Sequence, residues 1–187
     1  LSTALLDRLT LTESRLKGIV DSLESIKTLP DPLDKTIDSW PLENGLNIEK
    51  VSVPFGAIGI IYEARPNVTA DAIGLCIKSG NAVVLRGSAS AYNSNKVLSD
   101  LLREAAVEAG IPGDSIQLLE NVSREGVGTL VKMKEYLSLV IPRGGAALIN
   151  YVVNESTVPS IETGVGNCHV YIDKDANPEK ALEITIN

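Results

Sequence analysis

The chain has 187 residues, enough for one well-buried core, and a formal net charge of −7 at pH 7. This acidic balance disfavours nucleic acid and anionic membrane as the main partner, although single basic sites remain compatible with it. The sequence contains neither an uninterrupted apolar stretch of membrane-spanning length nor a basic and then apolar leader, so we expect a cytoplasmic protein that does not enter the membrane.

The first 52 residues are predicted to form a helix followed by an antiparallel extension. A capping-box pattern at residues 10–13 precedes a helix from about Glu13 to Lys27. Prolines then mark a loop that contains the single tryptophan, Trp40, which we interpret as a packing anchor. Alternation over residues 46–51 predicts a half-buried strand. The inward stripe of the helix is expected to consist of Leu16, Ile19, Val20, Leu23 and Ile26.

From residue 53 onward the chain alternates between strand, loop and helix. Apolar runs of strand length lie at residues 57–62, 81–86, 116–119, 137–141, 158–161 and 168–172. Helices are predicted after Asn67 with Thr69 as N-cap, after residue 90, from Ser123 as cap to about Met133, and over residues 146–153. The second of these is expected to face inward through Val97, Leu98, Leu101, Leu102, Ala105 and Ala109.

Successive β-α-β units require right-handed crossovers, so the fold class is α/β, a Rossmann-like parallel sheet with helices on both faces. We divide the chain into an N-terminal helix and antiparallel extension, residues 1–52, and a dinucleotide-binding domain, residues 53–187. That second domain is expected to be truncated, because the sequence ends inside a predicted helix.

A polar corner, Arg65-Pro66-Asn67, follows the first parallel strand. There the unpaired backbone N–H groups of a helix N-terminus and a guanidinium would converge, which suits an anionic ligand. In the alternative interpretation Arg65 pairs with a carboxylate such as Glu63, and Asn67 only caps the turn. The spacing alone leaves both interpretations open.

Three further loops follow predicted strands, where open α/β sheets bind their ligands. They are residues 86–88, 143–145 and 162–167. Arginines beside glycines favour a nucleotide phosphate, but the G-x-G-x-x-G fingerprint is absent, and such turns often only close a helix against a sheet. Glu162 at its strand end is a candidate for acid–base chemistry, with a helix cap or an ion pair as the alternative.

The sequence offers little for metal or thiol chemistry. Cys76 and Cys168 lie in apolar periodic segments and are predicted to be reduced core thiols. Cys168 and His169 are neighbours in a predicted strand, so they would point to opposite faces, and we reject a thiol–imidazole dyad. Because His169 is the only histidine, no histidine-based metal cluster or Ser-His-Asp triad can be assembled.

Four separated motifs, at residues 53–69, 78–87, 140–145 and 162–173, closely resemble γ-glutamyl phosphate reductase in that family's order. This family is also called glutamate-5-semialdehyde dehydrogenase and is part of the aldehyde dehydrogenase superfamily. The likeness covers essentially the whole chain and implies an aldehyde dehydrogenase-like cofactor domain without the standard fingerprint. It also implies NADPH-dependent reduction of L-glutamyl 5-phosphate to L-glutamate 5-semialdehyde with phosphate release, in proline biosynthesis.

The resemblance also implies roles for single residues. Asn67 matches the superfamily's oxyanion-stabilising asparagine, Arg65 would hold the substrate's phosphate or carboxylate, and Glu162 matches the strand-end glutamate, here shaping the nicotinamide pocket. Among the expected cofactor contacts, Arg86, Gly87 and Ser88 would meet the adenosine ribose and 2′-phosphate. The remaining expected cofactor contacts are Pro142, Arg143, Gly144, Gly145 and Gly164.

The family's nucleophilic cysteine is expected in a segment after Asn187, and neither Cys76 nor Cys168 matches its motif. Two hypotheses follow. In one, the chain is the cofactor-binding part of a complete reductase, which as a full-length protein would be a homo-oligomer with glutamate 5-kinase as a partner. In the other, it is a catalytically inert nucleotide-binding or scaffold fragment.

Overall fold

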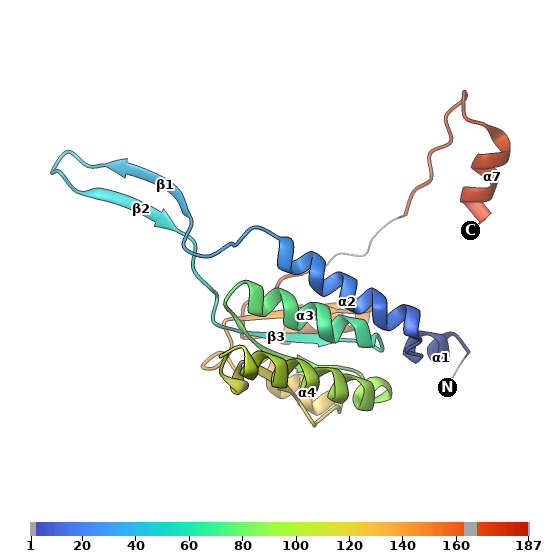
Figure 1. The fold of residues 1–187 in the computed structure, drawn as a ribbon, viewed down its shortest axis with the longest axis horizontal. Helices are drawn as coiled ribbons and strands as arrows, with labels where there is room; N and C mark the ends of the chain where they lie inside the picture. The colour runs from blue at the N-terminus through green and yellow to red at the C-terminus, as the bar shows by residue number, and fades with distance from the viewer. Residues whose placement is uncertain (1–2, 163–167, 187) are drawn as a thin grey trace.

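A computed structural model describes residues 3–162 and 168–186 (Figure 1). Its centre is a four-stranded parallel sheet in the order β5-β4-β3-β6. The α/β fold class and the parallel sheet predicted from the sequence are therefore confirmed. The strands are β3 (Ala57–Tyr62), β4 (Ala82–Arg86), β5 (Ile116–Leu118) and β6 (Leu139–Arg143).

The central strand β3 is apolar throughout because both of its faces are covered. Residues 58–62 are all buried, as expected for a parallel strand between two helical layers. Side chains alternate across the strand, so Ile60 joins a core cluster on one face and Ile61 joins another on the opposite face.

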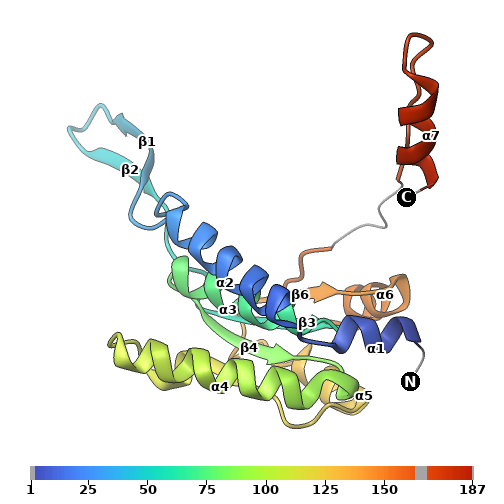
Figure 2. The same ribbon diagram turned by 45° about the vertical axis from the view of Figure 1, so that its right-hand side comes forward.

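Helices cover both faces of this sheet (Figure 2). α3 (Pro66–Lys78) and α4 (Tyr92–Glu108) contribute to the core cluster of one face, and α5 (Arg124–Leu130) and α6 (Ala146–Glu155) to that of the other. Each strand leads into the next through such a helix, as right-handed crossovers require. Short 3-10 turns, η1 (Ala89–Ala91) and η2 (Gly113–Ser115), flank α4.

Two helices precede the sheet, α1 (Thr3–Leu9) and α2 (Glu13–Thr28). The capping-box prediction needs a correction: Thr12 is the N-cap of α2 and accepts from the Arg15 N–H, whereas the Thr10 hydroxyl donates to the Leu6 carbonyl. The inward stripe is also narrower than predicted. Ile19 and Ile26 are buried, but Leu16 and Val20 are exposed because α2 packs mainly along α3.

The starts and faces of two further helices differ from the prediction. α3 begins at Pro66 with Arg65 as N-cap, since proline fits the first helical position, where no N–H partner is needed. In α4, Val97 and Leu101 are exposed, and the buried positions are Asn95 and Ser99. The apolar stripe was wide enough to fit two rotations of the helix, and contact with α3 selects one of them.

The antiparallel extension is a hairpin of β1 (Thr36–Pro41) and β2 (Asn47–Val51) that projects from the body (Figure 1). The predicted antiparallel pairing is confirmed, but the predicted half-buried strand is not. Every residue of β1 is exposed and only Ile48 of β2 is half-buried. Trp40 lies in β1 and is 41% exposed, so it is no packing anchor among the described residues.

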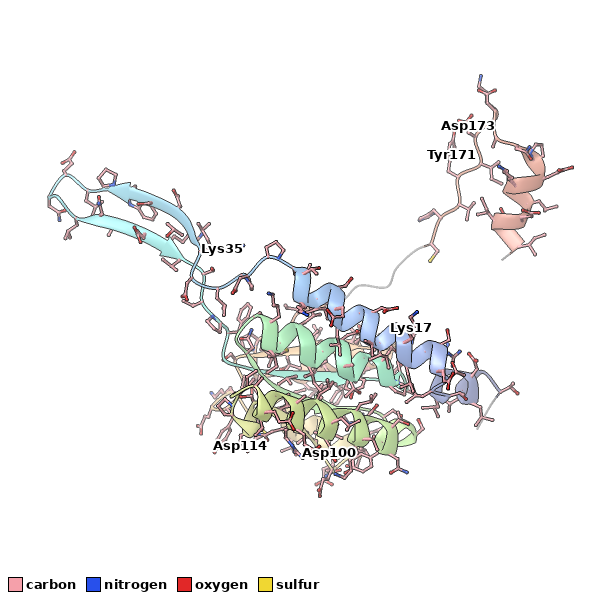
Figure 3. The ribbon with its side chains drawn as sticks, viewed as in Figure 1. Lys17, Lys35, Asp100, Asp114, Tyr171 and Asp173 are labelled. Carbon is pink, nitrogen blue, oxygen red and sulfur yellow. The ribbon has the colours of Figure 1, made fainter. Side chains whose placement is uncertain are left out.

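The last described segment, residues 168–186, lies apart from the sheet, and Figure 3 shows Tyr171 and Asp173 within it. It contains α7 (Pro178–Ile186) but no strand, so the strand predicted at 168–172 is wrong. Residues 158–161 form only an isolated bridge between Ser160 and Val140. Cys76 is buried as predicted, whereas Cys168 is exposed and is not a core thiol. Within residues 3–162 and 168–186, no helix combines the length and apolarity needed to cross a bilayer.

Candidate functional site

The parallel register brings three strand ends together. Ile61 of β3 lies beside Arg86 of β4, and Tyr62 of β3 lies beside Arg143 of β6. The loops that leave these strands carry most of the predicted site residues. They therefore lie at one edge of the sheet, as the strand-end rule for open α/β sheets leads one to expect.

A pocket of about 460 Å³ opens at this edge, between the end of β3 and the start of α6. It unites four residues predicted separately, Arg65, Arg143, Gly144 and Gly145, and adds Arg8 from α1. Sequence reasoning missed Arg8. No spacing pattern could have indicated it, because it is 57 positions before Arg65 and reaches the pocket only through tertiary packing.

A carboxylate occupies the N-terminus of α6. The Gly145 N–H, at the N-cap of this helix, donates to Glu63 Oε1 at 2.9 Å. A side chain at Gly144 would place its Cβ 2.9 Å from that carboxylate, so glycine is what allows Glu63 to approach. Among the described residues Arg65 forms no ion pair with Glu63, so the interpretation in which these two side chains neutralise each other is not supported.

A second pocket, of about 440 Å³, lies between α1, α2 and the start of α3. Asn67 borders it, and its amide donates to Asp71 Oδ2 at a long 3.5 Å. The Ser22 hydroxyl of α2 donates to the other oxygen of Asp71 at 2.7 Å. Because Arg8 and Arg65 line both pockets, they stand on the boundary between them.

Arg86 fastens the turn before α5. Its guanidinium donates to the carbonyls of Val122 and Ser123 at 2.6 and 2.9 Å. Burial lowers the pKa of this guanidinium, and its Nε is buried without a hydrogen-bond partner among the described residues. Contact of Arg86 with a 2′-phosphate stays a prediction.

Gly87 covers a buried polar network. The Tyr62 hydroxyl shares a hydrogen bond of 2.7 Å with Thr69 Oγ1, which in turn donates to Asn95 Oδ1 at 3.1 Å. A Cβ at Gly87 would collide with Asn95 Nδ2 and lie 3.2 Å from the Tyr62 hydroxyl. Ser88 follows as the N-cap of η1, where it accepts from the Ser90 N–H. Thr69 is thus a core residue of α3 and not its cap.

The remaining predicted residues that the structure describes border neither of these two pockets. Glu162 is exposed and follows the bridge at Ser160. Pro142 is buried within β6, and Gly164 lies outside the described residues. Burial raises the pKa of the Cys76 thiol to about 11, which leaves it protonated and unsuited as a nucleophile.

The buried phenol of Tyr62 predicts a pH dependence. Burial raises its pKa from 10.0 to about 12, and the bond to Thr69 offsets this only in part. Between these two values the unfolded chain loses the proton while the folded chain keeps it. The contribution to stability is therefore complete below pH 10 and is lost towards pH 12, by about 1.4 kcal/mol per pH unit.

Urea unfolding at pH 9.5 to 12 should therefore give a shallower loss of stability for Tyr62→Phe than for the parent chain. Tyr136→Phe is the control, since that ring is 71% exposed. Cys76 contributes equally to all three proteins. Equal slopes for Tyr62→Phe and the parent would contradict the assignment.

The chain is similar in sequence and in fold to proteins that are already known. The curated γ-glutamyl phosphate reductases of Anoxybacillus flavithermus and Clostridium botulinum are 52% and 54% identical to the chain over its whole length. The chain spans about 45% of the length of these relatives. No protein-family model matches it.

Solved structures agree with these relatives. The γ-glutamyl phosphate reductase of Thermotoga maritima superposes with a TM-score of 0.89 at 47% identity, and the match covers 100% of this chain and 45% of that one. The γ-glutamyl phosphate reductase of Saccharomyces cerevisiae superposes with a TM-score of 0.74 at 31% identity, and the match covers 100% of this chain and 47% of that one. An engineered glycolyl-CoA reductase with bound NADP+ shares the fold at a TM-score of 0.68 and 22% identity, over 97% of this chain and 46% of that one.

Proposed function

We propose that this chain supplies the cofactor-binding part of a γ-glutamyl phosphate reductase of proline biosynthesis. The chain is homologous to these reductases along its whole length. The reaction is the NADPH-dependent reduction of L-glutamyl 5-phosphate to L-glutamate 5-semialdehyde with release of phosphate. The observation that carries the proposal is 52% identity over all 187 residues. Because the chain spans about 45% of its relatives, catalysis is assigned to the complete reductase and not to this part alone.

The residues at the β4 end fit a phosphorylated nucleotide. Both hydrogen bonds of the Arg86 guanidinium to backbone carbonyls use Nη2, so Nη1 is the donor that would meet a 2′-phosphate. Gly87 has no space for a side chain, and Ser88 presents a hydroxyl beside it. We assign these three residues to the adenosine end of NADPH. The engineered reductase with bound NADP+ supports this cofactor class for the fold.

The diphosphate would meet a different environment. Glu63 already accepts a hydrogen bond from the Gly145 N–H and places a negative charge at the start of α6, which disfavours a phosphate there. We therefore propose that the turn of Pro142, Arg143 and Gly144, and not the helix N-terminus, lies near the cofactor's phosphates. When bound, NADPH supplies the hydride.

The substrate side belongs to Asn67 and Arg65. The exposed amide of Asn67 would donate to the carbonyl oxygen as negative charge develops on it, and Arg65 would face the phosphate or carboxylate of the substrate. Glu162 would border the nicotinamide. We keep residues 1–52 as an N-terminal helix and extension and 53–187 as the dinucleotide-binding domain. For the complete protein we propose a cytoplasmic homo-oligomer with glutamate 5-kinase as a partner.

Titration of NADPH and NADH into the 187-residue chain tests the proposal. Trp40 lies on the exposed hairpin, so the nicotinamide's own fluorescence is the better signal. We expect NADPH to bind, and Arg86→Gln to weaken it about tenfold or more while affecting NADH little, since a charge-assisted hydrogen bond contributes roughly 1.5–3 kcal/mol.

Arg103→Gln is the matched control, because Arg103 lies on α4 and pairs with Asp100. Circular dichroism establishes that each variant is folded. A folded chain that binds neither nucleotide would contradict the proposal that this chain supplies the cofactor-binding part. An equal loss of NADPH and NADH affinity in Arg86→Gln would overturn the assignment to the 2′-phosphate.

A further inference from the structure

Three arginines line the pocket at the start of α6, and none of them has a counter-ion of its own among the described residues. Arg8 comes from the last turn of α1, Arg65 from the N-cap of α3 and Arg143 from the end of β6. Within the described ranges none of these three side chains has a hydrogen-bond or ion-pair partner. Arg15 and Arg103, by contrast, are each paired with an aspartate.

This concentration of unpaired positive charge is unusual for the chain as a whole. The protein carries 24 acidic and 17 basic residues, so carboxylates are the more abundant partners. Yet among the residues that the structure describes, Glu63 is the only carboxylate that borders the pocket, and it already accepts a hydrogen bond from the Gly145 N–H. Three guanidinium groups against one carboxylate leave the pocket with an excess of positive charge, which favours a ligand with two negative charges.

The size and the lining of the pocket limit the kind of ligand that it can bind. A volume of about 460 Å³ admits a small phosphorylated acid, and the apolar lining is limited to Tyr62, Val68 and Ile149. Arginine forks match the oxygens of a phosphoryl group bidentately. Arg8 of α1 and Ile149 of α6 both border this pocket, so α1 and the α/β body complete it together.

We propose that this pocket binds the phosphoryl group of the small substrate and that Arg8 is its third guanidinium ligand beside Arg65 and Arg143. The inference rests on the proposed function, because it names the site of the substrate's phosphate. It assigns a binding role to α1, which lies outside the residues that we attribute to the dinucleotide-binding domain. The negative charge of Glu63 opposes the ligand, so it sets how tightly the phosphate is held.

Calorimetric titration of inorganic phosphate into the 187-residue chain is the test. We expect Arg8→Gln to weaken phosphate binding about tenfold or more, Arg8→Lys to weaken it less, and Arg103→Gln to leave it unchanged. Glu63→Gln is expected to strengthen binding, because glutamine still accepts from Gly145 N–H but carries no charge. These four variants change exposed side chains, and circular dichroism checks their folding.

The same proteins are then titrated with NADPH, with and without saturating phosphate. If the pocket serves the substrate, Arg8→Gln keeps its NADPH affinity, and the two ligands bind together. If NADPH and phosphate exclude each other, the pocket belongs to the cofactor and the inference is overturned. Absence of phosphate binding in a chain that binds NADPH would also overturn it while leaving the proposed function intact. Phosphate binding without NADPH binding would support the phosphate site but contradict the proposed function.

Discussion

Replacing Asn67 with alanine in the complete reductase is expected to lower kcat by about 10²- to 10³-fold. That is the usual effect of removing one donor that stabilises a developing oxyanion. Asn67 is the second residue of α3, and its exposed amide is held from one side by Asp71. The Ser22 hydroxyl steadies Asp71 in turn, so the amide is oriented before the substrate arrives.

Steady-state kinetics with glutamyl 5-phosphate check this prediction. Since the interaction is assigned to the transition state, kcat and kcat/KM should fall together while KM changes little. Asn93→Ala is the control, because Asn93 is an exposed asparagine of α4 that borders neither pocket. A rise in KM with an unchanged kcat would show that Asn67 only binds the substrate in its ground state.

Gly87→Ala is expected to destabilise the chain by about 1–3 kcal/mol, the usual cost of forcing a methyl group into a filled core. The added Cβ would collide with Asn95 Nδ2 and press on the Tyr62 ring. Both side chains are buried and belong to one hydrogen-bonded network through Thr69, so neither can move without breaking it. Urea unfolding at neutral pH measures the loss.

Gly18→Ala provides a control of opposite sign. Gly18 lies inside α2, and a Cβ there would meet nothing within 4 Å. Alanine should therefore stabilise the chain by roughly 0.5–1 kcal/mol through helix propensity alone. If Gly87→Ala unfolded at the same urea concentration as the parent, the network beneath it would have to be loosely packed.

The sequence predicted the fold well where a local signal determines it. The apolar run at residues 57–62 determines β3, because burial on both faces acts on neighbouring residues. The same holds for Ser123, which caps α5 as predicted. α5 ends at Leu130, a few residues earlier than expected, because helix ends without a glycine or proline signal are weakly specified.

The predictions failed where the surface that an element packs against decides which of its residues are buried. The stripe of α4 was apolar enough to fit two rotations, and only packing on α3 turns Asn95 inward and Leu101 outward. Trp40 and residues 168–172 have the composition of buried segments, yet Trp40 is 41% exposed and residues 168–172 are all exposed. Hydrophobicity indicates that a residue can be buried, but not which surface buries it.

For the candidate site, the sequence by itself determined the strand ends and therefore Arg65, Arg86 and Arg143, because parallel strands deliver their carboxyl ends to one edge. Only the tertiary structure decided which of them meet. It directs Arg86 to backbone carbonyls and brings Arg65 and Arg143 to one pocket with Arg8. It also sets Glu63 at the start of α6. Such contacts depend on the relative placement of whole helices, which side-chain periodicity along the chain does not encode.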